Sequence, residues 1–328
     1  MKVAVLSFAH ERAATYARLL RDMPGVDLVI ADPDGAPGDP ARGRAVAGEL
    51  GASYAGGWDE VFVLRPDAVV VTSEVDRRRE LVERAAEAGA HVLVEQPMAA
   101  KESDAEAMVR ACADAGVGLS LASPACFSPA FAAVREGIAD GEALGRLTTL
   151  HGSYNSPGSG AAGDRGALAA HAAVLLDMVD AVLGGEPAQQ VYAQTNSVLS
   201  GAPGVESAAL VSVRYANGAV ASIDCSWSLS TDEAARSGPA MTLIGEKASV
   251  EFNARPRLLG GFDVATGGER WESGGGDLYA AMLGAFLAAA AEGRGAGPDG
   301  AAGLRTLRVI EAAYASAQTG QPVDPGVS

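Results

Sequence analysis

The first third of the chain alternates short apolar runs with segments of helical periodicity, and this alternation constrains the fold more than any other feature. The apolar runs are continuous rather than alternating in polarity, which is typical of strands buried on both faces of a parallel sheet. The predicted strands are residues 3–6, 26–31, 68–72, 91–95 and 118–122, and the predicted helices are 11–22, 41–50, 77–88 and 104–115. We therefore expect an α/β domain with a doubly wound parallel sheet.

From about residue 123 the pattern changes to longer strands of alternating polarity. Asn217 and Gly218 suit a tight hairpin turn, because both residue types accept positive φ. The predicted strands are 147–154, 190–197, 209–215, 219–227, 241–244, 249–252, 261–265 and 269–272, and the predicted helices are 167–183, 278–291 and 301–319. We expect an α+β domain with an open, mainly antiparallel sheet, whose bare face suits a homodimer or homotetramer.

These patterns divide the 328 residues into two predicted domains, 1–122 for a dinucleotide and 123–328 for substrate and oligomer contacts. The last helix, 301–319, is a candidate to pack back on the N-terminal domain. No apolar run reaches the ~18 to 20 residues that a membrane span needs. The first residues run into a strand pattern without the regions of a secretory signal, so we expect a cytoplasmic protein with no membrane partner.

Charge and cysteine usage exclude several classes of protein. The chain has 41 Asp and Glu against 25 Lys and Arg, a formal net charge of −16, which disfavours a nucleic-acid partner. The chain has three lysines, Lys2, Lys101 and Lys247, so few positions could supply a catalytic lysine. The three cysteines lack a CxxC pair, which excludes a disulfide framework or zinc ribbon, and we expect no metal.

The turn after the first strand is the candidate pyrophosphate site, because helix N–H groups are available at the carboxyl ends of such strands. It contains Ser7, Phe8, Ala9 and His10, with Ser7, Ala9 and Arg12 at the positions of the GxGxxG glycines. His10 either contacts the cofactor or caps the next helix, and the cap is favoured.

Asp32 ends the second predicted strand, where a carboxylate can accept both ribose hydroxyls of an adenosine. A negative charge there repels a 2′-phosphate, which favours NAD(H) over NADP(H). The alternative, in which Asp32 only starts the turn over 32–35, stays open.

Three segments in order along the chain carry a resemblance to a known family: residues 67–72, 89–99 and 309–323. Together they resemble the glucose–fructose oxidoreductase and inositol 2-dehydrogenase family (Gfo/Idh/MocA). The resemblance implies a Rossmann domain, a C-terminal mixed-sheet domain and bound NAD(H) or NADP(H). It also implies a small sugar-like substrate, oxidised or reduced at a carbinol carbon of a sugar, cyclitol or related polyol, and dimers or tetramers formed through the sheet.

The resemblance also points to cofactor contacts where the predicted strands 68–72 and 91–95 end. These are Thr72, Ser73, Glu74, Glu95 and Gln96. Gln96 stands where family members have a catalytic lysine; its amide keeps hydrogen bonds but cannot transfer a proton at neutral pH.

The second family motif aligns through Gly166, Ala167, Leu168 and Asp177. This alignment puts Ala170 and Val174 where the family has a catalytic aspartate and histidine. His171 lies one helical turn before Val174, and an imidazole titrates near working pH, so we predict that His171 is the acid–base group. The alternative is a partly buried histidine bonded to a nearby loop.

The remaining candidates are substrate contacts: Tyr154, Asn155, Asp164 and Arg165. Arg77, Arg78 and Arg79 form the one dense basic cluster, which we interpret as a solvated helix start. The leading hypothesis is an NAD-dependent oxidoreductase in which His171 transfers a proton and Gln96 orients a hydroxyl. Two alternatives remain: a redox-neutral enzyme that uses NAD for elimination or epimerisation through a transient ketone, and a non-catalytic family member.

Overall fold

The computed structural model describes residues 1–36, 38–157, 166–200, 205–228, 238–265, 267–274 and 276–326. The chain forms two compact units, Met1–Ser123 with Tyr279–Leu304, and Pro124–Leu278 with Arg305–Ser328. The sequence predicts a domain boundary between residues 122 and 123, and the first unit's N-terminal segment ends at Ser123. The segment Tyr279–Leu304, which the sequence assigned to the second domain, groups with the first unit instead.

The first unit contains a six-stranded sheet in which every neighbouring pair is parallel. Its strands are β1 (Lys2–Leu6), β2 (Asp27–Ala31), β3 (Ser53–Ala55), β4 (Ala68–Val71), β5 (His91–Val94) and β6 (Leu119–Leu121). All four residues of β4 are buried, and so are four of the five in β1, which explains the continuous apolar runs. The predicted doubly wound α/β class is confirmed.

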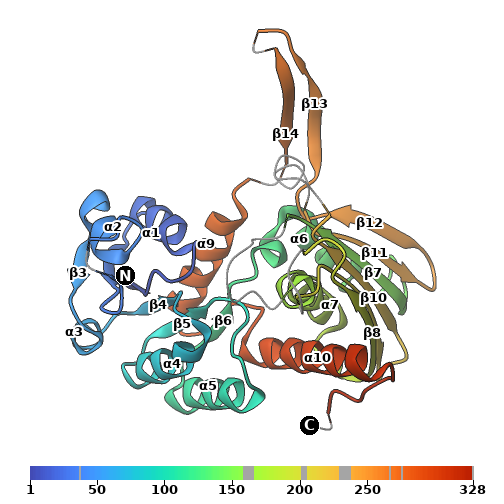
Figure 1. Ribbon diagram of the computed structural model, residues 1–328, viewed down its shortest axis with the longest axis horizontal. Helices are drawn as coiled ribbons and strands as arrows, with labels where there is room; N and C mark the ends of the chain where they lie inside the picture. The colour runs from blue at the N-terminus through green and yellow to red at the C-terminus, as the bar shows by residue number, and fades with distance from the viewer. Residues whose placement is uncertain are drawn as a thin grey trace. The chain divides into compact units, whose positions relative to one another are not determined.

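Helices cover this sheet (Figure 1). They are α1 (Ala13–Asp22), α2 (Gly43–Leu50), α3 (Trp58–Val63), α4 (Arg78–Glu87), α5 (Glu102–Ala115) and α9 (Leu278–Ala291). The sequence patterns did not predict β3 or α3, because three and six residues are too few to show a periodicity.

The strand order is β3-β2-β1-β4-β5-β6, so the chain leaves β1 in one direction and returns to β4 on its other side. Ligands of doubly wound sheets bind where this reversal opens a crevice at the carboxyl ends of the strands. In this unit that position is formed by the residues that follow β1, β2, β4 and β5.

The second unit contains a mixed sheet of order β12-β11-β7-β10-β9-β8. Its strands are β7 (Leu147–Asn155), β8 (Ala188–Asn196), β9 (Ala208–Tyr215), β10 (Val220–Ser226), β11 (Ala240–Gly245) and β12 (Ser249–Asn253). Neighbouring strands are antiparallel except β7 and β10, which run parallel. The β9–β10 hairpin turns as predicted at Asn217 and Gly218, although only Gly218 has a positive φ, 88°.

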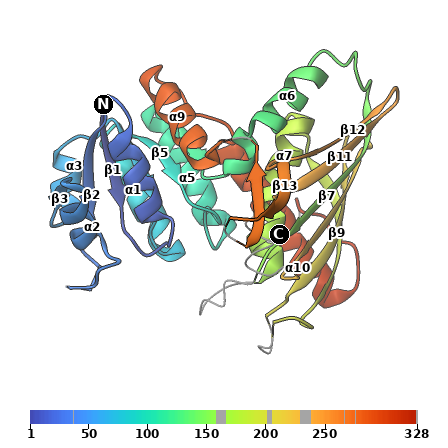
Figure 2. The same ribbon diagram turned by 90° about the horizontal axis from the view of Figure 1, so that it is seen from above.

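Helices lie against one face of this sheet, as Figure 2 shows. They are α6 (Pro129–Ile138), α7 (Ala173–Leu183), which follows a π-helical turn (Leu168–Ala172), and most of α10 (Gly300–Thr319). Leu150, Leu175 and Val211 belong to the core between the layers. No described helix covers the other face, and none is long and apolar enough to cross a membrane.

Two features of the second unit differ from the sequence-based expectation. The helix α6 was missed, although Ser128 accepts the N–H of Phe131 at 3.1 Å as its N-cap and Pro129 occupies its first turn. The predicted strand 261–265 begins earlier, as β13 (Arg257–Asp263), and pairs with β14 (Gly268–Ser273) in a separate hairpin that extends from the sheet (Figure 1).

Candidate functional site

The turn after β1 is tied to both neighbouring strands through its backbone. Ser7 has a φ of 72°, a left-handed conformation in the place where dinucleotide-binding turns have their first glycine. The N–H of Ala9 donates to Ser7 Oγ at 3.2 Å, and the N–H of His10 donates to the carbonyl of Thr72 at 3.1 Å. The hydroxyl of Thr72 donates to the carbonyl of Ser7 at 2.7 Å. These contacts fix the turn before any ligand arrives.

The carboxylate of Asp32 makes more hydrogen bonds within the protein than the sequence indicated. Its side chain is 0% exposed and forms an ion pair with Arg42, whose two donor nitrogens lie 2.8 and 2.7 Å from the carboxylate oxygens. The N–H groups of Phe8 and Gly43 donate to the same carboxylate at 3.2 and 2.8 Å. Four donors occupy the four lone-pair positions of a carboxylate, so Asp32 lacks acceptor capacity for ribose hydroxyls in this arrangement.

Arg42 brings a positive charge to the surface near the end of β2. Its side chain is 19% exposed, and the hydrogen bond to Asp32 raises the pKa of its guanidinium. Sequence reasoning missed Arg42, because its partner lies ten positions earlier and on a different element.

A buried polar cluster lies where β5 ends. Glu95 is buried; its carboxylate accepts the Tyr16 hydroxyl at 2.5 Å and the N–H of Gln96 at 3.1 Å. His10 Nδ1 lies 3.7 Å from the same carboxylate and accepts the N–H of Arg12 at 3.3 Å. Burial lowers the pKa of His10 below 6.5 despite the opposing effect of Glu95, so the imidazole is neutral at pH 7. The cluster brings together three predicted residues, His10, Glu95 and Gln96, with Tyr16, which no sequence signal singled out.

Arg78 corrects the interpretation of the basic cluster as a solvated helix start. Its side chain is buried and donates to the carbonyls of Ser73 at 3.2 Å, Glu95 at 2.8 Å and Pro97. Burial lowers the pKa of its guanidinium to about 10, so Arg78 is charged at neutral pH. It joins the segments that follow β4 and β5, and so fixes both sides of Gln96. The neighbouring predicted contact Glu74 is exposed.

In the second unit, His171 lies in the π-helical turn before α7, and turns of this kind are frequent at functional sites. The residue is 7% exposed. Its Nε2 lies 2.8 Å from Ser156 Oγ, and its ring centroid lies 4.7 Å from that of Tyr154. The structure thus brings His171 and Tyr154 together and adds Ser156, which the sequence did not single out.

The other predicted substrate contacts have different surroundings. The side-chain oxygen of Asn155 accepts the hydroxyl of Ser226 at 2.7 Å. Asp164 and Arg165 lie outside the described residues.

Glu206 anchors the segment that carries His171. Its carboxylate accepts the N–H of Leu168 at 3.1 Å and the hydroxyl of Tyr314 at 2.9 Å. Gly166 has a φ of 101°, and a Cβ there would lie 2.1 Å from the Glu206 carboxyl carbon. This contact is a physical reason for the glycine in the second sequence motif.

A doubly wound sheet with a fixed turn after β1, followed by a mixed sheet with one bare face, defines a class of two-domain dinucleotide-binding proteins. Two family descriptions match this chain. An oxidoreductase family with an NAD-binding Rossmann fold matches residues 36–123, and the GFO/IDH/MocA C-terminal domain matches residues 131–251. The chain belongs to the Gfo/Idh/MocA family.

Individual relatives agree over most of their length. A D-xylose 1-dehydrogenase (NADP(+)) from Haloferax volcanii is 29% identical over 87% of this chain and 89% of its own. A 1,5-anhydro-D-fructose reductase from Ensifer adhaerens is 31% identical over 83% of this chain and 85% of its own. The crystal structure of scyllo-inositol dehydrogenase from Lactobacillus casei, with NAD(H) and scyllo-inositol bound, has the same fold; its TM-score is 0.83 at 15% identity over 99% of each chain.

Proposed function

We propose that the protein is a nicotinamide-dinucleotide-dependent oxidoreductase that acts on a carbinol carbon of a sugar, cyclitol or related polyol. The observation that carries this proposal is the family membership, which both units of the chain share. Relatives that span more than four-fifths of the chain are named as a xylose dehydrogenase and an anhydrofructose reductase. Both names describe redox chemistry between a carbonyl and an alcohol of a sugar.

The first unit would hold the dinucleotide, and the bound nicotinamide would supply the hydride acceptor or donor. Two observations support this assignment: the strand order reverses between β1 and β4, and Ser7 adopts the backbone conformation of the fingerprint's first glycine. The residues proposed to contact the cofactor are Ser7, Phe8, Ala9, His10, Asp32, Thr72, Ser73, Glu74, Glu95 and Gln96. In the structure the side chains of Thr72 and Glu95 are bonded to neighbouring residues, and the N–H groups of Phe8, Ala9 and His10 also donate within the protein.

For the choice of cofactor, we propose NAD(H) over NADP(H), with measurable binding of both. The carboxylate of Asp32 disfavours a 2′-phosphate, whereas Arg42 neutralises that charge and is partly exposed.

Titration of the protein with NADH and with NADPH, followed by fluorescence, measures this cofactor preference. Arg42→Ala should increase the preference for NADH over NADPH, because it removes the cation and leaves the carboxylate. An unchanged ratio of the two dissociation constants would contradict a role for this ion pair in cofactor choice.

For catalysis, we propose that His171 transfers the proton of the substrate hydroxyl and that Gln96 orients this hydroxyl. Ser156, hydrogen-bonded to His171 Nε2, would orient the imidazole ring, because its hydroxyl can donate to or accept from this nitrogen. Arg78 would hold the Gln96 backbone in place through the carbonyls on both sides of it. Tyr154, Asn155, Asp164 and Arg165 remain proposed substrate contacts.

The test is formation of NADH by the purified protein with a panel of polyols and NAD⁺. Once a substrate is found, His171→Ala should lower kcat roughly 10²- to 10⁴-fold, the usual contribution of a positioned acid–base group. His151→Ala, on the exposed face of β7, is the matched control and should keep wild-type turnover. Full turnover by His171→Ala would overturn the catalytic assignment. Product formation without net NADH would favour the redox-neutral alternative.

A further inference from the structure

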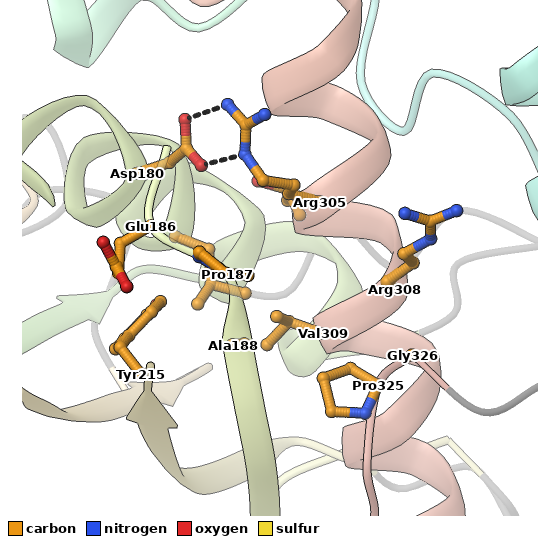
Figure 3. Close-up of a pocket in the computed structure, with 12 residues that line it drawn as sticks. Asp180, Glu186, Pro187, Ala188, Tyr215, Arg305, Arg308, Val309, Pro325 and Gly326 are labelled. Carbon is orange, nitrogen blue, oxygen red and sulfur yellow. Dashed lines mark hydrogen bonds and ion pairs between the residues drawn. The ribbon is translucent and has the colours of Figure 1, made fainter. Parts of the chain in front are cut away.

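A cavity lies in the second unit, beside the part of α7 that contains Leu176 and Asp180, whereas His171 precedes this helix. Figure 3 shows residues that line it. Its volume is about 120 Å³. It is lined by Leu176, Asp180, Glu186, Pro187, Ala188, Tyr215, Arg305, Thr306, Arg308, Val309, Pro325 and Gly326. Asp180 follows His171 by nine positions, about 14 Å at the helical rise of 1.5 Å per residue. The cavity is therefore separate from the histidine and independent of the proposed function.

Two of the charges in this cavity compensate each other. Arg305 donates to both oxygens of Asp180, at 2.6 and 2.9 Å, as the dashed lines in Figure 3 show. Each carboxylate oxygen has two acceptor positions, so Asp180 keeps acceptor capacity after pairing. The pair forms a fixed polar wall with no net charge.

Two further polar groups of the lining, Tyr215 and Glu186, have no ion pair of this kind. Tyr215 is 5% exposed, and no hydrogen bond joins its hydroxyl to another residue of the described chain. Burial and, to a smaller extent, the negative charge of Asp180 raise the pKa of this hydroxyl, so it is neutral and can both donate and accept. The hydroxyl oxygen is not among the buried side-chain atoms without a partner, so it reaches the cavity surface, where the polar group of a ligand could replace water as its hydrogen-bond partner.

Glu186 supplies a negative charge at the same cavity. Within the part of the chain that the structure describes, no Lys, Arg or His lies close enough to form an ion pair with Glu186. The guanidinium of Arg308 lies on the opposite side of the view from the Glu186 carboxylate in Figure 3. The remaining walls are apolar and include Leu176, Ala188 and Val309.

Size and charge together select a class of ligand. A dry cavity of about 150 Å³ holds a molecule of six carbon atoms, so this smaller one suits about five non-hydrogen atoms. The lining holds two carboxylates and two guanidiniums, but Arg305 is paired with Asp180 and Arg308 lies away from Glu186 in Figure 3, so a cation fits beside the Glu186 carboxylate. The net charge of −16 raises the local concentration of cations rather than anions. The apolar walls call for a short hydrocarbon body.

We propose that this cavity binds a small primary alkylammonium ion, with its ammonium group on Glu186 and the Tyr215 hydroxyl and its alkyl chain among Leu176, Ala188 and Val309. The ammonium has three donors, which match Glu186, the Tyr215 oxygen and the free acceptor positions of Asp180. The site lies on α7, α10 and the ends of β8 and β9, and so belongs to one unit.

The test is calorimetric titration of the full chain with butylammonium chloride, which has five non-hydrogen atoms. The matched ligand is 1-butanol, which has the same size and no charge. We expect butylammonium to bind about tenfold more tightly than 1-butanol and to lose affinity as ionic strength rises. Equal affinity for the two ligands would overturn the assignment of a cation site.

Variants separate this site from general attraction to an acidic protein. Glu186→Gln should weaken butylammonium binding about tenfold, and Tyr215→Phe should weaken it several-fold, because each removes one partner of the ammonium group. Ala188→Leu should abolish binding of both ligands by filling the cavity. The control Glu251→Gln, on β12, removes one carboxylate outside the cavity and should leave affinity unchanged. Equal losses in Glu186→Gln and Glu251→Gln would show that net charge alone attracts the ligand and would refute the proposal.

Discussion

At the scale of single residues, the turn after β1 combines a strained backbone with a compensating hydrogen bond. Ser7 is left-handed, with a φ of 72°, and its hydroxyl accepts the N–H of Ala9. A side chain with a Cβ costs roughly 1 kcal/mol in this conformation. The serine offsets part of that cost with a hydrogen bond that glycine cannot make.

Replacements at Ser7 separate the two effects. Ser7→Ala keeps the Cβ and loses the hydrogen bond, so we expect it to destabilise the first unit. Ser7→Gly loses the same bond but relieves the strain, and it should be more stable than Ser7→Ala by about 1 kcal/mol. Urea unfolding of the two variants measures this difference. Equal stabilities would mean that the turn relaxes away from the left-handed conformation.

His10 makes the stability of the first unit depend on pH. Burial lowers its pKa below 6.5 in the folded chain, so the unfolded chain takes up a proton first as the pH falls through 6.5. We therefore expect the free energy of unfolding to decrease from pH 7 toward pH 5. His10→Gln should reduce this slope without removing it, because burial lowers the pKa of His91 as well. An NMR titration that puts the midpoint of His10 above 6.5 would contradict the expected sign.

At the scale of elements, the start of the His171 helix depends on a residue from outside that helix. Glu206 accepts both the N–H of Leu168 and the hydroxyl of Tyr314. The helix has no side-chain cap of its own at Ala167, so this carboxylate serves in place of one.

Two substitutions test the anchoring role. Glu206→Ala removes the acceptor of the buried Leu168 N–H and one partner of the Tyr314 hydroxyl, and it should lower the stability of the second unit by about 2 kcal/mol. Glu206→Gln keeps an acceptor oxygen in nearly the same place and should cost clearly less. Thermal unfolding compares them, and a loss of equal size in both would mean that charge, rather than hydrogen bonding, holds the helix.

At the scale of the whole molecule, the bare face of the mixed sheet is the candidate surface for self-association. It exposes apolar side chains on several neighbouring strands, among them Tyr192 on β8, Leu210 on β9 and Ile244 on β11. Leu210 is 53% exposed. The commonest homo-oligomer is a twofold dimer, in which both copies use the same surface.

A single charge on this face tests the association. We expect wild-type protein to sediment as a dimer or tetramer, and Leu210→Lys to shift it toward the monomer, because a buried ammonium would lack a partner. Val264→Lys, on an exposed residue after β13, is the matched control and should keep the wild-type state. A wild-type protein that sediments as a monomer at micromolar concentration would contradict the expected homo-oligomer.

The class of the first domain, the family and most candidate residues could be predicted from the amino-acid sequence. Continuous apolar strands and the motif segments around Glu95 and Gly166 are local patterns, so they can be recognised without knowledge of the tertiary structure. The contacts that those residues make depend on how the chain packs. This packing saturated Asp32 with four donors, buried Arg78 beneath the segments after β4 and β5, and placed Ser156 and Glu206 beside the His171 helix. Most of these contacts join positions from 10 to 38 residues apart, where neither periodicity nor motif spacing carries information. Hydrogen-bond capacity and burial are properties of the packed chain, and they decide which polar side chains remain available for a ligand.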